Sequence, residues 1–180
     1  MSTAPAIPFV SVEEYLKTEY EPRCEYLDGV LQPKAMSDLT HGGVQALLAA
    51  FLLSQKKKYG LIVASELHSR VTPTRYRIPD VCVLTRRPQD GKYADAATPP
   101  LFTIEIASQG EPWTELRGKL ADHLAMGVST VIIADPYNKT VMVATQAELL
   151  REIASPLIVN IEVPGRGLLQ LDFDDLYSQL

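Results

Sequence analysis

Cysteine is scarce in this sequence, in which Cys24 and Cys82 are the only two among 180 residues. They lie far apart, and a small secreted domain stabilised by disulfides carries more cysteines than this. No Cys and His residues have the spacing of zinc ligands. We therefore expect a reduced, cytoplasmic protein, in which Cys82 is a small buried hydrophobe within an apolar run.

Long apolar segments are also lacking. The longest, residues 44–53, is interrupted by Gln45 and is far shorter than the roughly 20 residues that span a bilayer. Residues 1–8 have neither the basic start nor the apolar centre of a secretory signal. The sequence therefore predicts that the protein neither crosses a membrane nor enters the secretory route.

An excess of positive charge is absent as well. Lys and Arg number 17 against 22 Asp and Glu, which gives a net charge of −5. This balance argues against a protein that coats nucleic acid by charge alone. It does not argue against an enzyme that approaches phosphate through bound metal ions, because such ions invert the local charge.

The composition that remains is that of an ordinary globular domain. Hydrophobic residues make up 46% and charged residues 22% of the chain, both typical of globular folds. A chain of 180 residues is long enough to bury one substantial core. We expect a short N-terminal arm over residues 1–10, which carry two prolines, and a single domain over residues 11–180.

Apolar periodicity and turn residues predict the order of the elements. Helices are expected at residues 11–17, 40–58, 114–126 and 173–179, and strands at 61–71, 77–84, 101–107, 130–134, 140–144 and 158–163. Asp28-Gly29 predicts a hairpin turn, and Gly127 the end of the third helix. Residues 148–153 fit either a helix or a strand. The order favours an α/β (α+β) fold, a mixed sheet flanked by helices.

A carboxylate in an apolar strand marks the first candidate site residue. Asp80 follows Pro79 within the predicted strand 77–84, although Asp is depleted in strands and proline removes a ladder donor. Period-two alternation places Asp80 and Cys82 on one face of that strand. The alternative is an Asp at a strand edge that faces solvent or pairs with an arginine.

A second carboxylate interrupts the predicted strand 101–107. Glu105 lies between Ile104 and Ile106, and burying its charge is costly without a partner or a cation. The alternative is the polar face of an amphipathic strand. Adjacent strands lie about 4.8 Å apart, so Asp80 and Glu105 can meet if their strands pair. Two carboxylates that close repel unless a proton or a cation lies between them, and oxygen ligands suit Mg²⁺.

Basic residues supply the remaining candidates. Lys119 lies on the flank of the predicted helix 114–126, where it could position a water or stabilise phosphorane charge; the alternative is a solvated lysine paired with Glu115. Four arginines flank Asp80 in the sequence and could contact a phosphate backbone. They are Arg75, Arg77, Arg86 and Arg87.

Short motifs follow one another from residue 11 to about residue 173. They are Val12-Glu13-Glu14-Tyr15-Leu16, Glu25-Tyr26-Leu27-Asp28-Gly29, His41, Ile78-Pro79-Asp80-Val81, Ile104-Glu105-Ile106, Lys119-Leu120, Gly127-Val128 and Ala134-Asp135-Pro136. In order and spacing they resemble the Uma-type restriction endonuclease family, a branch of the PD-(D/E)XK nuclease superfamily. The resemblance implies a restriction-endonuclease-like mixed β-sheet flanked by helices.

The resemblance also implies roles for individual residues. Pro79-Asp80 is similar to the PD element and Glu105 to the acidic residue of (D/E)XK, so both would bind metal. The lysine usually found two residues after the acidic residue is absent, and Lys119 is similar to one that has moved to the next helix. Glu25 matches an N-terminal acid that would bind metal or orient a water. His41 matches a family histidine at a helix entrance.

The chain departs from this family pattern at three places. Ser108-Gln109-Gly110 stands where the family usually has a Ser-Pro-Ser/Thr turn. His123 stands where a tyrosine is usual, and Glu115 where an aspartate is usual. These departures bear on activity and on the choice of substrate more than on the fold.

The resemblance implies an endonuclease that hydrolyses DNA phosphodiester bonds with Mg²⁺ or Mn²⁺. Two cuts in a duplex would favour a two-fold homodimer. Two alternatives stay open. One is an inactive nuclease-fold module that binds DNA. The other is a structural or regulatory homodimer that assembles through residues 137–143.

Overall fold

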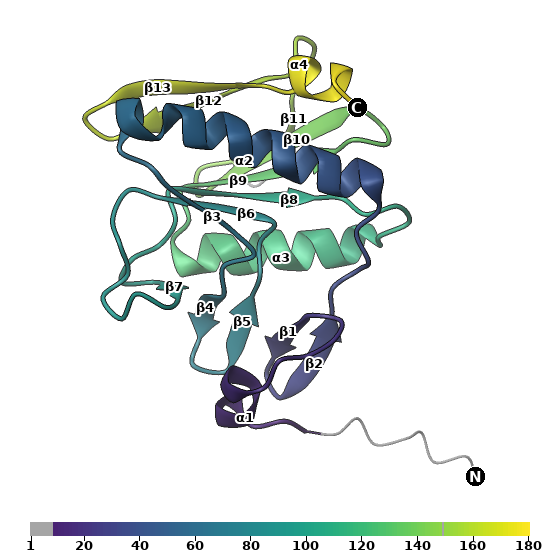
Figure 1. The fold of residues 1–180 in the computed structure, drawn as a ribbon, viewed down its shortest axis with the longest axis vertical. Helices are drawn as coiled ribbons and strands as arrows, with labels where there is room; N and C mark the ends of the chain where they lie inside the picture. The colour runs from purple at the N-terminus through teal and green to yellow at the C-terminus, as the bar shows by residue number, and fades with distance from the viewer. Residues whose placement is uncertain (1–8, 149) are drawn as a thin grey trace.

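The computed structural model describes residues 9–148 and 150–180, in which the strands form three sheets (Figure 1). A six-stranded sheet has the order β11-β10-β9-β8-β6-β3, a five-stranded sheet the order β2-β1-β5-β4-β7, and β12 and β13 form a hairpin. Helices flank the sheets, which confirms the predicted α+β class. Most of the predicted N-terminal arm, residues 1–8, lies outside the described residues.

The six-stranded sheet is mixed. β8 and β9 run parallel, whereas the other neighbours pair antiparallel. Its strands are β3 (Ile62–Ser65), β6 (Val81–Leu84), β8 (Phe102–Ile106), β9 (Thr130–Asp135), β10 (Thr140–Thr145) and β11 (Arg151–Glu152).

The five-stranded sheet begins with the predicted hairpin. Asp28 and Gly29 have φ values of 52° and 98°, the left-handed conformation that a two-residue hairpin loop requires. The strands of this sheet are β1 (Cys24–Leu27), β2 (Val30–Pro33), β4 (Ser69–Thr72), β5 (Arg75–Arg77) and β7 (Ala94–Asp95).

Capping residues define the helix ends. The Ser11 hydroxyl accepts a hydrogen bond from the backbone N–H of Glu14, and Gly127 ends its helix at a φ of 98°, as predicted. Both are standard solutions for the unpaired backbone groups of helix termini. The helices are α1 (Val12–Lys17), α2 (Leu39–Tyr59), α3 (Trp113–Met126) and α4 (Phe173–Ser178).

The two long helices cover opposite faces of the six-stranded sheet (Figure 1). α2 buries Val44 and Leu48 in the core that also holds Ile104, and α3 buries Leu120 in the core that holds Ile133. Each such side chain contributes about 1.5–3 kcal/mol on burial. The sheet is therefore covered on both faces, which gives the side chains of its central strands defined positions.

Two strand predictions were wrong in the same way. Residues 61–71 form β3 and β4, and residues 77–84 form the end of β5 and all of β6, so each segment crosses between sheets. Glu66 has a φ of 52°, which ends the first strand. Pro79 has no N–H for a ladder bond, which ends the second. Hydrophobic alternation continues through both breaks and conceals them.

The C-terminal third contains more strand than predicted. The strand predicted at residues 158–163 is β12 (Ile158–Val163), and it pairs with β13 (Gly167–Asp172), which was not predicted. The ambiguous segment 148–153 contributes β11 rather than a helix. In the described ranges no helix is long and apolar enough to cross a membrane.

Candidate active site

Asp80 is held at the point where the chain enters β6. It is 2% exposed. Its Oδ1 accepts a hydrogen bond of 2.8 Å from Nζ of Lys34, and its Oδ2 accepts one of 2.7 Å from the backbone N–H of Ile106. Nε2 of His41 lies 3.4 Å from the same Oδ2. The side chain is therefore neither solvent-facing nor paired with an arginine.

The environment keeps Asp80 ionised. Burial alone would raise the pKa of its carboxyl, but the His41 hydrogen bond and the Lys34 charge outweigh burial and hold the pKa well below its usual range. Burial disfavours the charged forms of Lys34 and His41, yet contact with Asp80 leaves the pKa of each raised. The Asp80 carboxylate thus has the Lys34 ammonium and the His41 imidazole as neighbours.

Glu105 lies one step further along the paired strands. In the antiparallel pairing of β6 with β8, Val81 is opposite Ile104, so the residues on either side of this pair, Asp80 and Glu105, adjoin. Glu105 is 1% exposed. Its Oε1 lies 2.7 Å from Nε2 of His123, whereas its Oε2 is buried without a hydrogen bond from the described residues.

Lys119 reaches the same carboxylate from α3. Its Nζ lies 3.7 Å from Oε2 of Glu105 and donates a hydrogen bond of 2.8 Å to Oε1 of Glu111. Burial disfavours the charged ammonium, but the carboxylates of Glu105 and Glu111 outweigh it and raise the pKa. The lysine therefore points inward, and its ion-pair partners are Glu105 and Glu111 instead of Glu115.

Glu25 accepts a hydrogen bond on each of its carboxylate oxygens. Its Oε2 accepts a hydrogen bond of 2.6 Å from the Arg77 guanidinium, and its Oε1 accepts one of 3.0 Å from the backbone N–H of Ile78. Arg77 also donates to Asp122 at 2.7 Å and is 4% exposed. One oxygen of Glu25 therefore belongs to a buried ion-pair network, and the other holds the backbone at Ile78.

The segment Ile78-Pro79-Asp80 joins the two larger sheets and assembles the site. Its backbone groups are satisfied by side chains, because the Ile78 N–H donates to Glu25 and the Ile78 carbonyl accepts 2.8 Å from Nζ of Lys34. Buried backbone groups need such partners. This crossover brings residues of the five-stranded sheet beside those of the six-stranded sheet.

The four predicted phosphate-binding arginines occupy different environments. Arg77 is buried, as described above. Arg75 donates to Asp28 and to Asp122. Arg86 and Arg87 lie exposed in the segment that follows β6. Arg86 and Arg87 are therefore exposed, whereas Arg75 and Arg77 are paired with carboxylates.

Two features of the site suit a divalent cation. Glu105 has a buried oxygen without a hydrogen bond from the described residues. The Lys34 ammonium lies between Oδ1 of Asp80 and the carbonyl of Ile78, so a cation is already stabilised there. Glu105 therefore offers a buried oxygen to a metal, and Asp80 offers a position where a cation is already bound. Glu25 instead accepts hydrogen bonds from Arg77 and from the Ile78 backbone. In the described part of the chain, no three His, Cys, Asp or Glu side chains gather as a preformed ligand set.

Sequence reasoning missed two partners at the site and did not assign a third. Lys34 lies in the segment after β2, and Glu111 in the loop before α3; neither gave a periodic or motif signal. His123 is one helical turn from Lys119, so its proximity to the site was visible in the spacing. Its contact with Glu105 depends on how α3 packs against β8.

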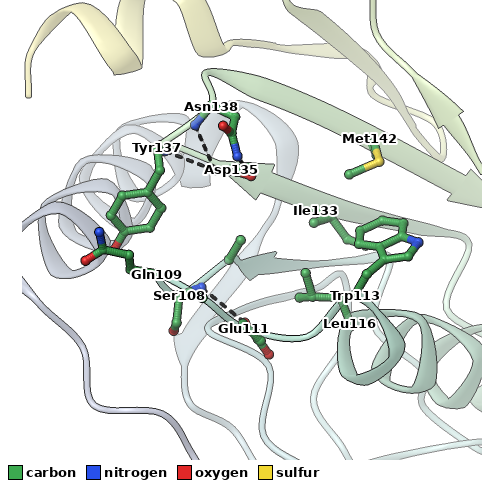
Figure 2. A pocket seen from close by; sticks show the side chains of 12 residues that line it. Ser108, Gln109, Glu111, Trp113, Leu116, Ile133, Asp135, Tyr137, Asn138 and Met142 are labelled. Atoms are coloured by element: carbon green, nitrogen blue, oxygen red, sulfur yellow. Dashed lines mark hydrogen bonds between the residues drawn. The ribbon is translucent and has the colours of Figure 1, made fainter.

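A cavity of about 330 Å³ opens beyond the C-terminal ends of β8 and β9 (Figure 2). The turn Ser108-Gln109-Gly110 lines one side, and Asp135 and Tyr137 line the other. Trp113 closes one end with its indole ring. The turn that departs from the family pattern is therefore a wall of a cavity beside Glu111, the partner of Lys119.

Comparison with known families adds an independent observation. The model of the Uma2 family, described as "Putative restriction endonuclease", matches residues 12–165. The chain belongs to this family. The matched range takes in every site residue described above, so the resemblance drawn from the motifs is confirmed. No curated protein matches the chain.

A solved structure shares the architecture of this Uma2 protein. The crystal structure of a "putative nuclease belonging to DUF820" from Anabaena variabilis ATCC 29413 has a TM-score of 0.77 and 24% identity, over 94% of this chain and 98% of that one. This similarity confirms the fold. The DrdV-DNA complex, solved by electron cryomicroscopy, has a TM-score of 0.44 and 14% identity, over 76% of this chain and 10% of that one. A likeness this low supports no conclusion.

Proposed function

We propose that this Uma2 protein is a metal-dependent endonuclease that hydrolyses DNA phosphodiester bonds. The observation that carries the proposal is the buried pair Asp80 and Glu105 on adjacent antiparallel strands, with Lys119 3.7 Å from Glu105. Membership of a family described as "Putative restriction endonuclease" supports the same conclusion. Free, buried cysteines suit a reducing cytoplasm, where we propose that the enzyme acts.

Each residue has a role that follows from its environment. Asp80 and Glu105 would hold Mg²⁺ or Mn²⁺, which when bound lowers the pKa of a water and neutralises phosphate charge. Lys119 stays protonated because neighbouring carboxylates raise its pKa, so it would stabilise negative charge on the phosphate. His41 holds Asp80 from the helix entrance, and Glu25 positions Arg77 and the Ile78 backbone.

Cleavage of plasmid and single-stranded DNA with Mg²⁺ or Mn²⁺ tests this proposal. Glu105→Gln keeps the shape of the side chain but removes the charge, and we expect at least about a hundredfold loss of rate, as for other losses of key electrostatic groups. Glu162→Gln is the matched control, since Glu162 is exposed on β12. Circular dichroism checks that each variant folds. Equal rates for Glu105→Gln and the wild type would refute this mechanism.

A second candidate is an inactive nuclease-fold module that binds DNA or assembles as a homodimer. It is favoured by the ion pairs that already occupy Asp80, Glu105 and Glu25. For such a module, DNA binds equally well with and without a chelator and no product forms. Sedimentation tests the homodimer, and residues 137–143 are its predicted interface. Much of that segment is β10, which has β9 and β11 on either side.

A further inference from the structure

Lys34 is a buried cation that no motif anticipated. It lies between β2 and α2, and its side chain is 12% exposed. Its Nζ donates hydrogen bonds of 2.8 Å to Oδ1 of Asp80 and of 2.8 Å to the carbonyl of Ile78. The same Nζ lies 4.0 Å from Oε1 of Glu66. The ammonium is thus surrounded by carboxylate and main-chain carbonyl oxygens.

These oxygens are the ligands that a hard divalent cation prefers. A metal ion on Oδ1 of Asp80 would meet the Lys34 ammonium at close range, and two cations repel strongly where water is excluded. We infer that Lys34 is a built-in counter-cation that occupies the cation position at Asp80 and must leave before a divalent metal binds there. The inference rests on the proposed function for the presence of that metal.

A second carboxylate, Glu66, lies within reach of the Lys34 ammonium. Its backbone N–H is fixed by a hydrogen bond of 2.8 Å to the carbonyl of Arg23, but its four-carbon side chain is flexible. Glu66 is 32% exposed in its side chain, lies next to the ammonium and already pairs with Arg23. Rotation toward Glu66 would therefore move the charge from Asp80 to a more solvated carboxylate without moving the backbone.

Direct metal titration tests this inference without measuring cleavage. Mn²⁺ is titrated by isothermal calorimetry into the wild type, Lys34→Met and Lys34→Arg. We expect Lys34→Met to bind Mn²⁺ about tenfold more tightly or better, because the competing charge is gone. Lys34→Arg keeps the charge and should bind no more tightly than the wild type. Lys57→Met, an exposed change at the end of α2, is the matched control.

The double variant Lys34→Met/Asp80→Asn locates the effect, since it should lose the gain if the metal binds at Asp80. Unchanged or weaker binding by Lys34→Met overturns the inference, as does the absence of Mn²⁺ binding in every variant. Circular dichroism confirms that each titrated variant is folded. If Lys34→Met bound Mn²⁺ more tightly but the wild type did not cleave DNA, the nuclease proposal would fail and the inference about Lys34 would stand. If the wild type cleaved DNA but Lys34→Met bound Mn²⁺ no more tightly than the wild type, the nuclease proposal would stand and the inference about Lys34 would fail.

Discussion

Nε2 of His123 lies 2.7 Å from Oε1 of Glu105, and both side chains are almost completely buried. The contact joins α3 to β8 through the candidate catalytic carboxylate. It fixes one oxygen of Glu105 and leaves the other facing Lys119 at 3.7 Å. His123 is therefore a positioning residue for Glu105 in the proposed mechanism.

Removing this imidazole should cost stability. His123→Leu leaves a buried carboxylate oxygen without its partner, and we expect a loss of about 1–3 kcal/mol in the free energy of unfolding. Urea denaturation followed by circular dichroism measures it. His123→Gln retains a donor and is expected to lose less. If the Leu variant were as stable as the Gln variant, the hydrogen bond would not contribute.

Arg77 is expected to act on stability more than on DNA. Arg77→Met leaves the carboxylates of Glu25 and Asp122 without their guanidinium partner. Removing one member of a buried ion pair lowers the free energy of unfolding by about 3–5 kcal/mol. Arg87→Met, at an exposed position, should leave the free energy of unfolding nearly unchanged. Urea denaturation of the two variants compares them directly. If Arg77→Met were as stable as the wild type but bound DNA more weakly, the result would support the phosphate contact of Arg77 predicted from the sequence.

Arg86 and Arg87 are expected to contact the DNA backbone. The double change Arg86→Met/Arg87→Met should weaken DNA binding for all sequences alike. It should also reduce the slope of log K against log salt by about 1 for each phosphate that the protein no longer neutralises. Fluorescence anisotropy across a salt series, with a chelator to prevent cleavage, measures both effects. An unchanged slope would show that the DNA lies elsewhere.

Tyr137 should make stability fall at alkaline pH. Its hydroxyl donates to Asp38, the cap of α2, and burial together with that carboxylate raises the pKa of Tyr137 from 10.0 to about 12. Between these values the unfolded state loses the proton first, so the folded state binds more protons and stability falls as pH rises.

The variant Tyr137→Phe isolates that effect. Its melting temperature should lie below that of the wild type at pH 8, and the gap should close as pH rises through about 12. Other titrating groups affect both proteins equally and cancel in the difference. A gap that stays constant from pH 8 to pH 12 would mean that the hydrogen bond does not shift the pKa of Tyr137.

Local patterns predicted most elements because each depends on neighbours in the chain. The Asp28-Gly29 hairpin and the Gly127 helix end follow from backbone preferences of single residues. Strand boundaries were harder to predict, because hydrophobic alternation continues through Glu66 and Pro79 although the chain passes from one sheet to the other there. Propensity alone does not say which sheet a strand joins.

The sequence by itself determined most of the elements, the α+β class and the family. It also singled out Asp80 and Glu105 as carboxylates within apolar segments, which are costly to bury without a partner, and Lys119 on the flank of a helix. Only the tertiary structure decided their partners. Lys34 and His123 are remote in the chain from the carboxylates they contact. Ion pairs depend on distances of a few ångströms in a low-dielectric interior, and those distances exist only once both long helices have packed against the sheet.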